Sequence, residues 1–462
     1  MQSSATSRQY FSILATILSD IVSFYISITG AYFTRLIFDF IFPAITPLEF
    51  SYVHFLSLWW IPLLFVFFFG YEGLYTKRFL FWDEIKEILK TIGLSGLVLF
   101  SLVSLTKISD QISRVTLILL LLYMFLSAPF LRYITKILLT KIGVWEKRVL
   151  VLGHGDIADD TVEAIISEKN LGWGIPTFKS YPMDFSFVQD GDFDIVIFAL
   201  HQADPKELKN AATEASRFAK IVYAVPDIKG VALPNADLYR IYTRQLLLLK
   251  LNNNLKSPVN KVAKWVLDRV LFLIALIPLA MIILFIATLI KIDSKGSVFY
   301  SHERIGKNGK RIRVYKFRSM YIDSAERLKK ILSESKEAKK EWESSYKLKN
   351  DPRITRVGQY LRKYSLDELP QIFNVLAGNM SFVGPRPVLE KELTEYYKDD
   401  SRYYLNVHPG ITGLWQVSGR NDTTYEMRVA LDSWYVQNWS VWLDIVILFK
   451  TFKVVLSKDG AY

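Results

Sequence analysis

The sequence predicts a membrane protein built from an α-helical N-terminal bundle, a soluble α/β domain and a mostly α-helical C-terminal domain. Three observations predict this fold class. Long apolar segments lie within residues 1–146, short buried strands alternate with helical patterns over residues 147–251, and residues 252–462 are polar and basic apart from one further apolar segment. These ranges are the predicted domain boundaries.

The composition indicates which classes of partner the chain can bind. Of its 462 residues, 51% are hydrophobic and 15% aromatic, and 57 Lys and Arg against 45 Asp and Glu give a net charge of +12. Beside long apolar segments, this charge favours an anionic membrane face or phosphorylated substrates, and we expect no nucleic-acid partner. The absence of cysteine excludes disulfides, thiolate catalysis and cysteine-ligated metals.

Four apolar segments form the predicted membrane bundle. Their apolar cores lie at residues 10–38, 55–71, 91–106 and 115–131. With their flanks they reach the ~20 residues that a spanning helix needs. The first contains Asp20, which we interpret as a polar residue packed between helices because no basic partner is evident. Basic loops follow the second and fourth segments, which places the N-terminus and everything after about residue 140 in the cytoplasm.

The middle of the chain has the pattern of a small parallel α/β domain, Rossmann-like in its alternation. Strands are predicted at 148–153, 194–200 and 219–226, with helices at 157–169 and 205–218. Gly153, Gly155 and Ala158 make only a partial dinucleotide fingerprint, and no clear acidic residue follows for ribose binding. We therefore expect a structural or regulatory domain rather than a nicotinamide site.

A fifth apolar segment, Val270–Ile290, is long enough to cross a bilayer, but both of its flanks are basic. Basic flanks on both sides favour the cytoplasmic face for both ends. Pro278 would bend a helix here. We expect a re-entrant helix over about residues 265–291; an ordinary kinked spanning helix is the alternative.

The polar C-terminal part carries three blocks with candidate site residues. Residues 302–320 place Arg304, Lys316 and Arg318 around a Gly-rich turn, and residues 408–422 place Arg420 in a Ser-Gly-Arg-Asn turn. Taken alone, the first block is typical of a solvated basic hairpin. A charged and exposed helix is predicted over residues 326–349.

The third block, residues 360–387, sets Asp367 and Glu368 side by side near Arg362 and Arg386. Ser365 and Glu368 match a helix capping box, so the pair could merely cap a helix. Capping needs one acid and leaves the arginines unexplained. An ionised carboxylate can attack phosphorus, two carboxylates can partly hold Mg²⁺, and arginines can bind diphosphate oxygens.

Residues from about 256 to 462 resemble the bacterial polyprenyl-phosphate sugar-1-phosphate transferases, the monotopic phosphoglycosyl transferases. The resemblance is carried by KFRSM, SLDELPQIFNVLAGNMSFVGPRP and PGITGLWQVSGRND, together with Lys264 and Asp268. The LKNDPRIT run and the C-terminal sequence are most similar to members that transfer galactose phosphate to undecaprenyl phosphate. Four N-terminal helices and an α/β domain resemble the large polytopic members.

The resemblance implies a two-step exchange. Asp367 matches the nucleophile that attacks the sugar-bearing phosphorus of a UDP-sugar and expels UMP; undecaprenyl phosphate then takes the sugar phosphate, which initiates a surface polysaccharide such as O-antigen, capsule or exopolysaccharide. Glu368 matches the second acid, with Mg²⁺ binding, orientation or assistance to the lipid phosphate as possible roles. The predicted phosphate-binding residues are Arg304, Lys316, Arg318, Arg362, Arg386 and Arg420.

Several alternatives stay open. The sugar is galactose, or glucose as the alternative. Two alternatives belong to other functional classes. One is a non-catalytic scaffold of polysaccharide assembly, and the other is a nucleotide-dependent sugar-modifying enzyme acting through the α/β domain. Counted from Asp268, the helix-breaking proline of the family would fall near Met281, whereas this chain has Pro278. We expect a homo-oligomer, a dimer, in the bacterial inner membrane with the catalytic domain on the cytoplasmic face, where it also contacts membrane lipids.

Overall fold

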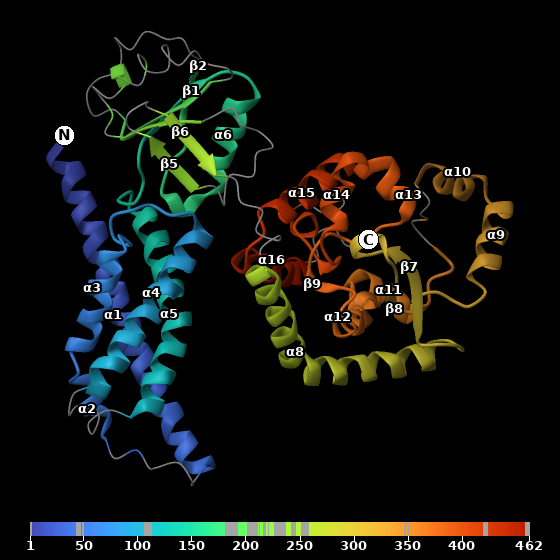
Figure 1. Ribbon diagram of the computed structural model, residues 1–462, viewed down its shortest axis with the longest axis horizontal. Coiled ribbons are helices and arrows are strands. Elements are labelled where there is room, and N and C mark those ends of the chain that lie inside the picture. The colour runs from blue at the N-terminus through green and yellow to red at the C-terminus, as the bar shows by residue number, and fades with distance from the viewer. Residues whose placement is uncertain are drawn as a thin grey trace. The chain divides into compact units, whose positions relative to one another are not determined.

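The chain forms two compact units, Met1–Lys229 and Gly230–Tyr462, and each is described by itself (Figure 1). The structure is a computed structural model. It describes residues 2–42, 48, 50–105, 113–180, 193–200, 211, 213–215, 219, 221–225, 237–241, 246–250, 258–345, 348, 351–418 and 424–457.

The first unit begins with the apolar helices. They are α1 (Gln2–Ile41), α2 (Tyr52–Leu56), α3 (Trp60–Tyr71), α4 (Phe81–Leu105) and α5 (Arg114–Lys141). The four predicted apolar segments are thus helical, the second as the pair α2 and α3. Phe24, Phe65, Ile92 and Leu120 are at most 1% exposed and belong to one core between these helices.

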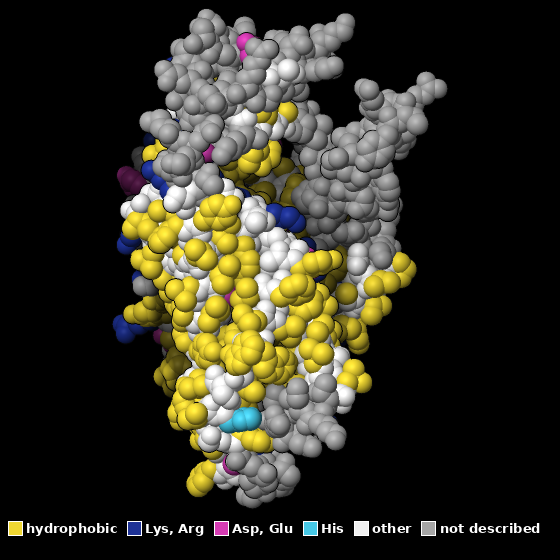
Figure 2. Space-filling model, turned by 90° about the vertical axis from the view of Figure 1, so that its left-hand side faces the viewer, with side chains coloured by type: hydrophobic (Ala, Val, Ile, Leu, Met, Phe, Trp, Pro, Cys, Tyr) yellow, Lys and Arg dark blue, Asp and Glu magenta, His cyan; other side chains and the backbone are white. Residues whose placement is uncertain are grey.

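The outward faces of these helices are also apolar. Figure 2 shows hydrophobic side chains spread over the helical surface that faces the viewer. Leu14, Phe67, Leu97 and Leu126 are between 64% and 73% exposed. So much exposed apolar surface is costly in water and suits lipid. Across the described residues, five helices are long and apolar enough to cross a membrane, and α8 (Pro258–Asp293) is the fifth.

Asp20 does have a basic partner, contrary to the sequence-based interpretation. Arg132 of α5 donates from Nε and Nη2 to the two Asp20 carboxylate oxygens, at 2.7 and 2.6 Å. The Tyr75 hydroxyl donates to the same carboxylate at 2.8 Å. Asp20 and Arg132 are 112 positions apart, so no local pattern could pair them.

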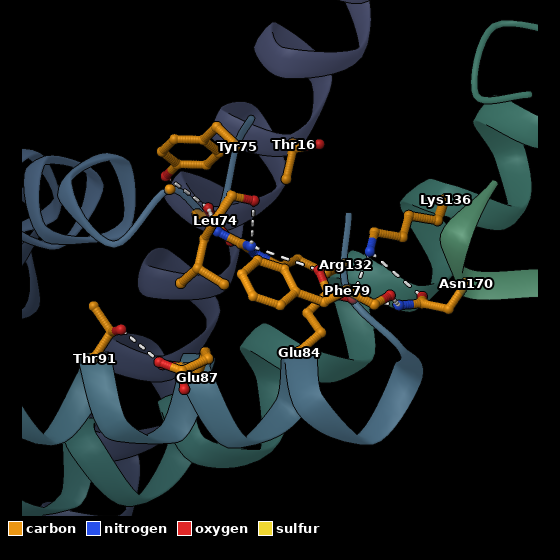
Figure 3. Close-up of polar contacts among 12 residues, drawn as sticks. Thr16, Leu74, Tyr75, Phe79, Glu84, Glu87, Thr91, Arg132, Lys136 and Asn170 are labelled. Carbon is orange, nitrogen blue, oxygen red and sulfur yellow. Dashed lines mark hydrogen bonds and ion pairs between the residues drawn. The ribbon is translucent and has the colours of Figure 1, made fainter. Parts of the chain in front are cut away.

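A second buried ion pair lies beside the first and reaches the α/β part of the unit (Figure 3). Glu84 of α4 pairs with Lys136 of α5. Asn170, from the short helix η2 (Lys169–Leu171), donates to Glu84 Oε2 at 2.8 Å and to the Phe79 carbonyl at 3.0 Å. Buried charges require such partners, and here the partners fasten the helical bundle to the segment after α6 (Asp156–Ser167).

The α/β part contains a four-stranded parallel sheet in the order β2-β1-β3-β4. Its strands are β1 (Val149–Gly153), β2 (Thr177–Ser180), β3 (Ile195–Ala199) and β4 (Ile221–Ala224). The predicted strands near 148–153, 194–200 and 219–226 correspond to β1, β3 and β4, whereas β2 was not predicted. Its four residues are all exposed, so it lacks the apolar run by which the other strands were found. Most of the helix predicted at 205–218 lies outside the described residues.

The second unit opens with the antiparallel hairpin β5 (Asp237–Ile241) and β6 (Leu246–Lys250), which was not predicted. After α8 come the hairpin β7 (Phe299–Ile305) and β8 (Arg311–Phe317), joined by η5 (Lys307–Gly309). The elements that follow are α9 (Ser324–Glu334), α10 (Lys336–Ser345), α11 (Arg356–Lys363), η6 (Leu366–Gln371), α12 (Ile372–Leu376), β9 (Ser381–Val383), α13 (Glu390–Glu392), η7 (Leu393–Tyr397), η8 (Lys398–Asp400), α14 (Ser401–Leu405), β10 (Gly410–Thr412), η9 (Trp415–Val417), α15 (Tyr425–Gln437) and α16 (Val441–Ser457).

The single charged helix predicted over 326–349 is two helices, α9 and α10. Ser335 between them has extended backbone angles (φ −126°, ψ 120°). Its hydroxyl accepts a hydrogen bond from the Ala338 amide at 3.1 Å, which caps the start of α10. The prediction was wrong here because charged residues of both signs continue across the break between α9 and α10, so the charge pattern does not show where the first helix ends.

Helix α8 is held to the body of its unit at both ends. In its first half, Lys264 Nζ donates to the Val383 carbonyl at 2.8 Å and to Asp444 Oδ2 at 2.7 Å. At its last residue, Asp293 Oδ2 accepts from the Val357 amide at 3.0 Å. Figure 1 shows α8 changing direction part-way along its length.

Candidate functional site

A cleft of about 1070 Å³ gathers most of the predicted site residues in the second unit. Its walls come from the β7–β8 hairpin, from α11 and η6, and from the loops after β9 and β10. Seven predicted residues line it: Arg304, Lys316, Arg318, Arg362, Asp367, Glu368 and Arg386. Arg420 lies outside the described residues.

Strand alternation explains how the hairpin supplies its cations. Ile312 and Val314 are buried, and Lys316 continues the same face of β8 because side chains two residues apart point the same way. Arg304 is the cross-strand partner of Ile312, and Tyr300 that of Lys316, so both share this face. The block at 302–320 is therefore a hairpin, but not merely a solvated one, since one of its faces turns toward the cleft.

The acidic pair converges on one cation. Lys316 Nζ lies 2.6 Å from Glu368 Oε1 and 3.7 Å from Asp367 Oδ2. The Asp367 side chain is 15% exposed and that of Glu368 is 27% exposed, so both are reachable from the cleft but shielded from bulk water. The lysine therefore balances part of the charge that the pair brings together.

The capping-box interpretation of this pair is wrong. Ser365 has a positive φ of 55° and its side chain makes no capping hydrogen bond to η6. A non-glycine residue in this left-handed region reverses the chain direction after α11. Arg362, in the last turn of α11, and Asp367, in the first turn of η6, consequently line the same cleft.

Burial raises the pKa of Asp367 above its ordinary value, Lys316 opposes that rise, the neighbouring Glu368 adds to it, and Arg362 opposes it further. Lys316 is the first cation that favours the charged form, and desolvation makes the ionised oxygen less solvated and more reactive.

Two of the arginines in the cleft hold neighbouring structure. Arg362 Nε donates to Ser319 Oγ at 2.9 Å. Arg318 donates from Nη1 to the Lys295 carbonyl at 2.5 Å and from Nη2 to the Ser294 carbonyl at 2.7 Å, just beyond the end of α8. Arg318 therefore fixes the C-terminal end of α8 beside the cleft, a use that its position in the sequence did not indicate.

Glycines bring the loop that carries Arg386 close to the next strand. The Gly384 amide donates to the Thr412 carbonyl at 2.9 Å, and the Gly410 amide donates to the Pro385 carbonyl at 2.8 Å. A Cβ on Gly410 would lie 2.1 Å from the Gly384 nitrogen, so only glycine permits this approach. The Gly-Pro-Arg-Pro turn is thereby pinned with Arg386 on the cleft.

With this geometry in place, comparisons with known proteins give the family. The model described as "Bacterial sugar transferase" matches residues 259–458. The chain is 40% identical over 405 residues to the undecaprenyl-phosphate galactose phosphotransferase of Salmonella typhimurium, covering 84% of each protein. This chain belongs to the bacterial sugar transferase family. The resemblance seen in the sequence is thus confirmed.

Two further relatives widen the comparison. The UDP-galactose-lipid carrier transferase of Erwinia amylovora is 40% identical over 411 residues and covers 84% of each protein. The UDP-glucose:undecaprenyl-phosphate glucose-1-phosphate transferase of Klebsiella pneumoniae is 35% identical over 278 residues, which is 58% of this chain and 56% of that protein. The similarity to the first two relatives therefore extends well beyond the segment that the family model matches.

Several side chains of this sugar transferase reach the cleft although the sequence reading missed them. They are Tyr300, His302, Trp415 and Gln416. Burial and then the neighbouring Arg304 and Lys316 lower the pKa of His302, so its imidazole is neutral near pH 7. The alternation of residues 299–305 could have placed Tyr300 and His302 on the face of Arg304.

Few of the described side chains are placed to coordinate Mg²⁺. Among the described residues, no group of three or more His, Asp or Glu side chains is arranged to hold a metal. Asp367 and Glu368 offer two carboxylates that already converge on one cation, Lys316. Mg²⁺ is often held by one or two carboxylates together with substrate phosphates. The pair therefore fits Mg²⁺ as a partial site that a diphosphate would complete.

Proposed function

We propose that this sugar transferase moves a sugar-1-phosphate from a UDP-sugar to undecaprenyl phosphate and releases UMP, the first step of a surface polysaccharide. The observation that carries the proposal is the Asp367–Glu368 pair set on Lys316 within a cleft lined by four arginines. Galactose is favoured because the two relatives that cover 84% of the chain are named for galactose. Glucose is the alternative, supported by the Klebsiella relative.

In the first proposed step, an ionised oxygen of Asp367 attacks the sugar-bearing phosphorus of the UDP-sugar. A P–O bond to aspartate forms, the P–O bond to UMP breaks, and UMP leaves with the bonding electrons. In the second step, an oxygen of undecaprenyl phosphate attacks the same phosphorus, and Asp367 leaves as a carboxylate. Atoms and charge balance, and no oxidant or reductant is required.

The cations of the cleft neutralise the phosphates during both steps. Arg304 and Arg386 line the cleft beside the acidic pair, and guanidinium groups bind phosphate oxygens in bidentate fashion. Lys316 opposes the rise that burial causes in the pKa of Asp367, and so favours the ionised form that attacks. Mg²⁺, when bound, would neutralise the diphosphate and be held in part by Asp367 and Glu368.

The substrate assignment is tested by measuring UMP release. Purified full-length protein is incubated with undecaprenyl phosphate and, separately, UDP-galactose, UDP-glucose and UDP-N-acetylglucosamine. We expect release with UDP-galactose to exceed that with UDP-glucose. If UMP is released with none of the three UDP-sugars while the lipid and the UDP-sugars are intact, the result would support the alternative of a non-catalytic scaffold of polysaccharide assembly.

Removal of divalent metal should reduce UMP release by about a hundredfold or more, because a metal that neutralises a diphosphate contributes several kcal/mol to the transition state. The measurement is the initial rate in excess EDTA, followed by addition of MgCl₂. Recovery with Mg²⁺ is expected. A full rate in EDTA would contradict the metal requirement.

We also propose that α8 is re-entrant. Both ends are fastened to one compact body, through Lys264 to Val383 and through Asp293 to Val357. Between them Pro278 interrupts the helical hydrogen bonding. The side chains of Leu273, Ile277, Met281, Leu284 and Phe285 are 65–73% exposed. A helix whose ends return to one body can bury such residues in one leaflet without crossing the bilayer.

Cysteine labelling tests this topology, and the absence of native cysteine makes it clean. Single cysteines at Ser257 and Ser297 should resist an impermeant maleimide added outside intact spheroplasts and react after lysis. Ser297 is exposed and lies just after α8, so it is accessible to reagent. Labelling of the Ser297 cysteine from outside would mean that α8 spans the membrane.

The remaining assignments complete the proposal. The chain is a multi-pass protein of the bacterial inner membrane, and its catalytic domain at 252–462 faces the cytoplasm, where UDP-sugars are made. Within residues 147–251, the β1–β4 sheet forms a Rossmann-like domain with a structural or regulatory role, fastened through Asn170 to the membrane bundle of residues 1–146. We also propose that the active form is a homodimer.

A further inference from the structure

A second cavity, of about 250 Å³, lies beside the first half of α8 and shares no lining residue with the cleft. Its polar lining comes from α8, from η5 and from the turn before β10. The charged side chains are Lys261, Lys264, Asp268, Arg269 and Lys307. None of them is used in the proposed chemistry.

Positive charge in this cavity exceeds negative charge. Lys264 is balanced by Asp444 at 2.7 Å. Asp268 Oδ1 accepts hydrogen bonds from Ser381 Oγ at 3.0 Å and from the Phe382 amide at 3.1 Å, so this oxygen already has two donors outside the lysines.

Arg269, Lys261 and Lys307 supply the other positive charges of the cavity lining. Arg269 Nη1 donates to the Val375 and Leu376 carbonyls, both at 3.0 Å, so its partners are neutral. Over the described part of the chain, neither Lys261 nor Lys307 has a carboxylate within ion-pair distance. A cavity lined by three such cations and one carboxylate suits an anion.

Both lysines line this same cavity. Burial lowers the pKa of Lys307, and the charge of Lys261 lowers it further. Two ammonium groups held together without an anion repel each other, and a phosphate between them would remove that repulsion. Lys307 belongs to the β7–β8 turn and Lys261 to α8, so an anion here would join two elements.

The surroundings of the cavity point to a membrane ligand. Trp265 lines the cavity and its side chain is 59% exposed, while Val262 beside it is 61% exposed. The uncharged apolar run of α8 begins at Val270. Tryptophan is enriched at the level of the lipid headgroups, next to the hydrocarbon. If α8 is re-entrant, as proposed above, the cavity lies where phospholipid phosphates are found.

We propose that this cavity binds the phosphate of an anionic membrane phospholipid between Lys261 and Lys307, and so fixes the first half of α8 at the membrane surface. The lipid is favoured over a soluble phosphate because the cavity opens beside exposed apolar side chains.

The test is lipid binding by native mass spectrometry of the full-length protein in a neutral detergent. Short-chain phosphatidylglycerol and, separately, phosphatidylcholine are titrated. The Lys261→Gln/Lys307→Gln variant should lose about tenfold or more in phosphatidylglycerol affinity, because it removes both ammonium groups that attract the lipid phosphate. Phosphatidylcholine should bind weakly to both proteins.

The matched control is Lys291→Gln/Lys310→Gln, which removes the same charge at two exposed lysines outside the cavity. It should bind phosphatidylglycerol as the wild type does. Equal losses in both variants, or no loss in the first, would overturn the site. Displacement by millimolar inorganic phosphate as effective as by the lipid would overturn the lipid assignment. Thermal unfolding verifies that both variants are folded, and the binding readout needs no catalysis, so it stands even if UMP release fails.

Discussion

Replacing Asp367 with asparagine should reduce the rate of UMP release by a factor of about 10³ or more, the scale of losing a catalytic nucleophile. The amide cannot form the bond to phosphorus. The change is nearly isosteric and the side chain is 15% exposed, so the fold should persist. The measurement is UMP release under saturating UDP-galactose and undecaprenyl phosphate.

Glu368→Gln is the matched control for this change. It removes the neighbouring charge, which lies 2.6 Å from Lys316, but leaves Asp367 in place. We expect a smaller loss and a release of UMP that persists at a measurable rate. If Glu368→Gln were inactive and Asp367→Asn retained most of its activity, the roles of the two acids would have to be exchanged.

Replacing Lys316 with methionine should lower kcat/KM by about 10²–10³-fold, the usual cost of removing one charged group that stabilises a transition state. Lys316 contacts both acids and faces the substrate cleft. Methionine keeps much of the volume but not the charge. The variant Lys316→Arg keeps the charge and is expected to lose less.

Lys316→Met should also change the pH dependence of kcat/KM. Burial raises the pKa of Asp367 and Lys316 opposes that rise, so removing Lys316 raises the pKa further. Only the ionised carboxylate attacks phosphorus, and activity therefore increases as pH rises through this pKa. The acidic limb of the kcat/KM profile should move to higher pH in Lys316→Met. An unmoved limb would mean that another group sets it.

Local patterns in the sequence predicted much of this molecule. Apolar length identified the four N-terminal apolar segments and α8, because hydrophobicity over ~20 residues is a strong signal. Runs of apolar residues identified β1, β3 and β4. The edge strand β2 is exposed throughout and has no such run, and the hairpin of β5 and β6 was missed as well.

The candidate site was predicted residue by residue from its motifs, but its geometry was not. Nothing local shows that Lys316 lies between Asp367 and Glu368, since that contact joins a hairpin to a helix some 50 residues later. The positive φ of Ser365 is likewise invisible in a string that matches a capping box. Pairs such as Asp20 with Arg132 also depend on tertiary packing, so the local sequence does not predict them.

The central claim is that Asp367 carries the sugar phosphate covalently, and trapping the adduct tests it most directly. Purified protein is mixed with UDP-galactose and Mg²⁺ in the absence of undecaprenyl phosphate, quenched with acid, digested and analysed by mass spectrometry. We predict a hexose phosphate on the peptide that contains Asp367, absent from Asp367→Asn and lost when undecaprenyl phosphate is added before quenching. An adduct on a different residue, or UMP release that occurs only when both substrates are present and leaves no adduct, would contradict the account.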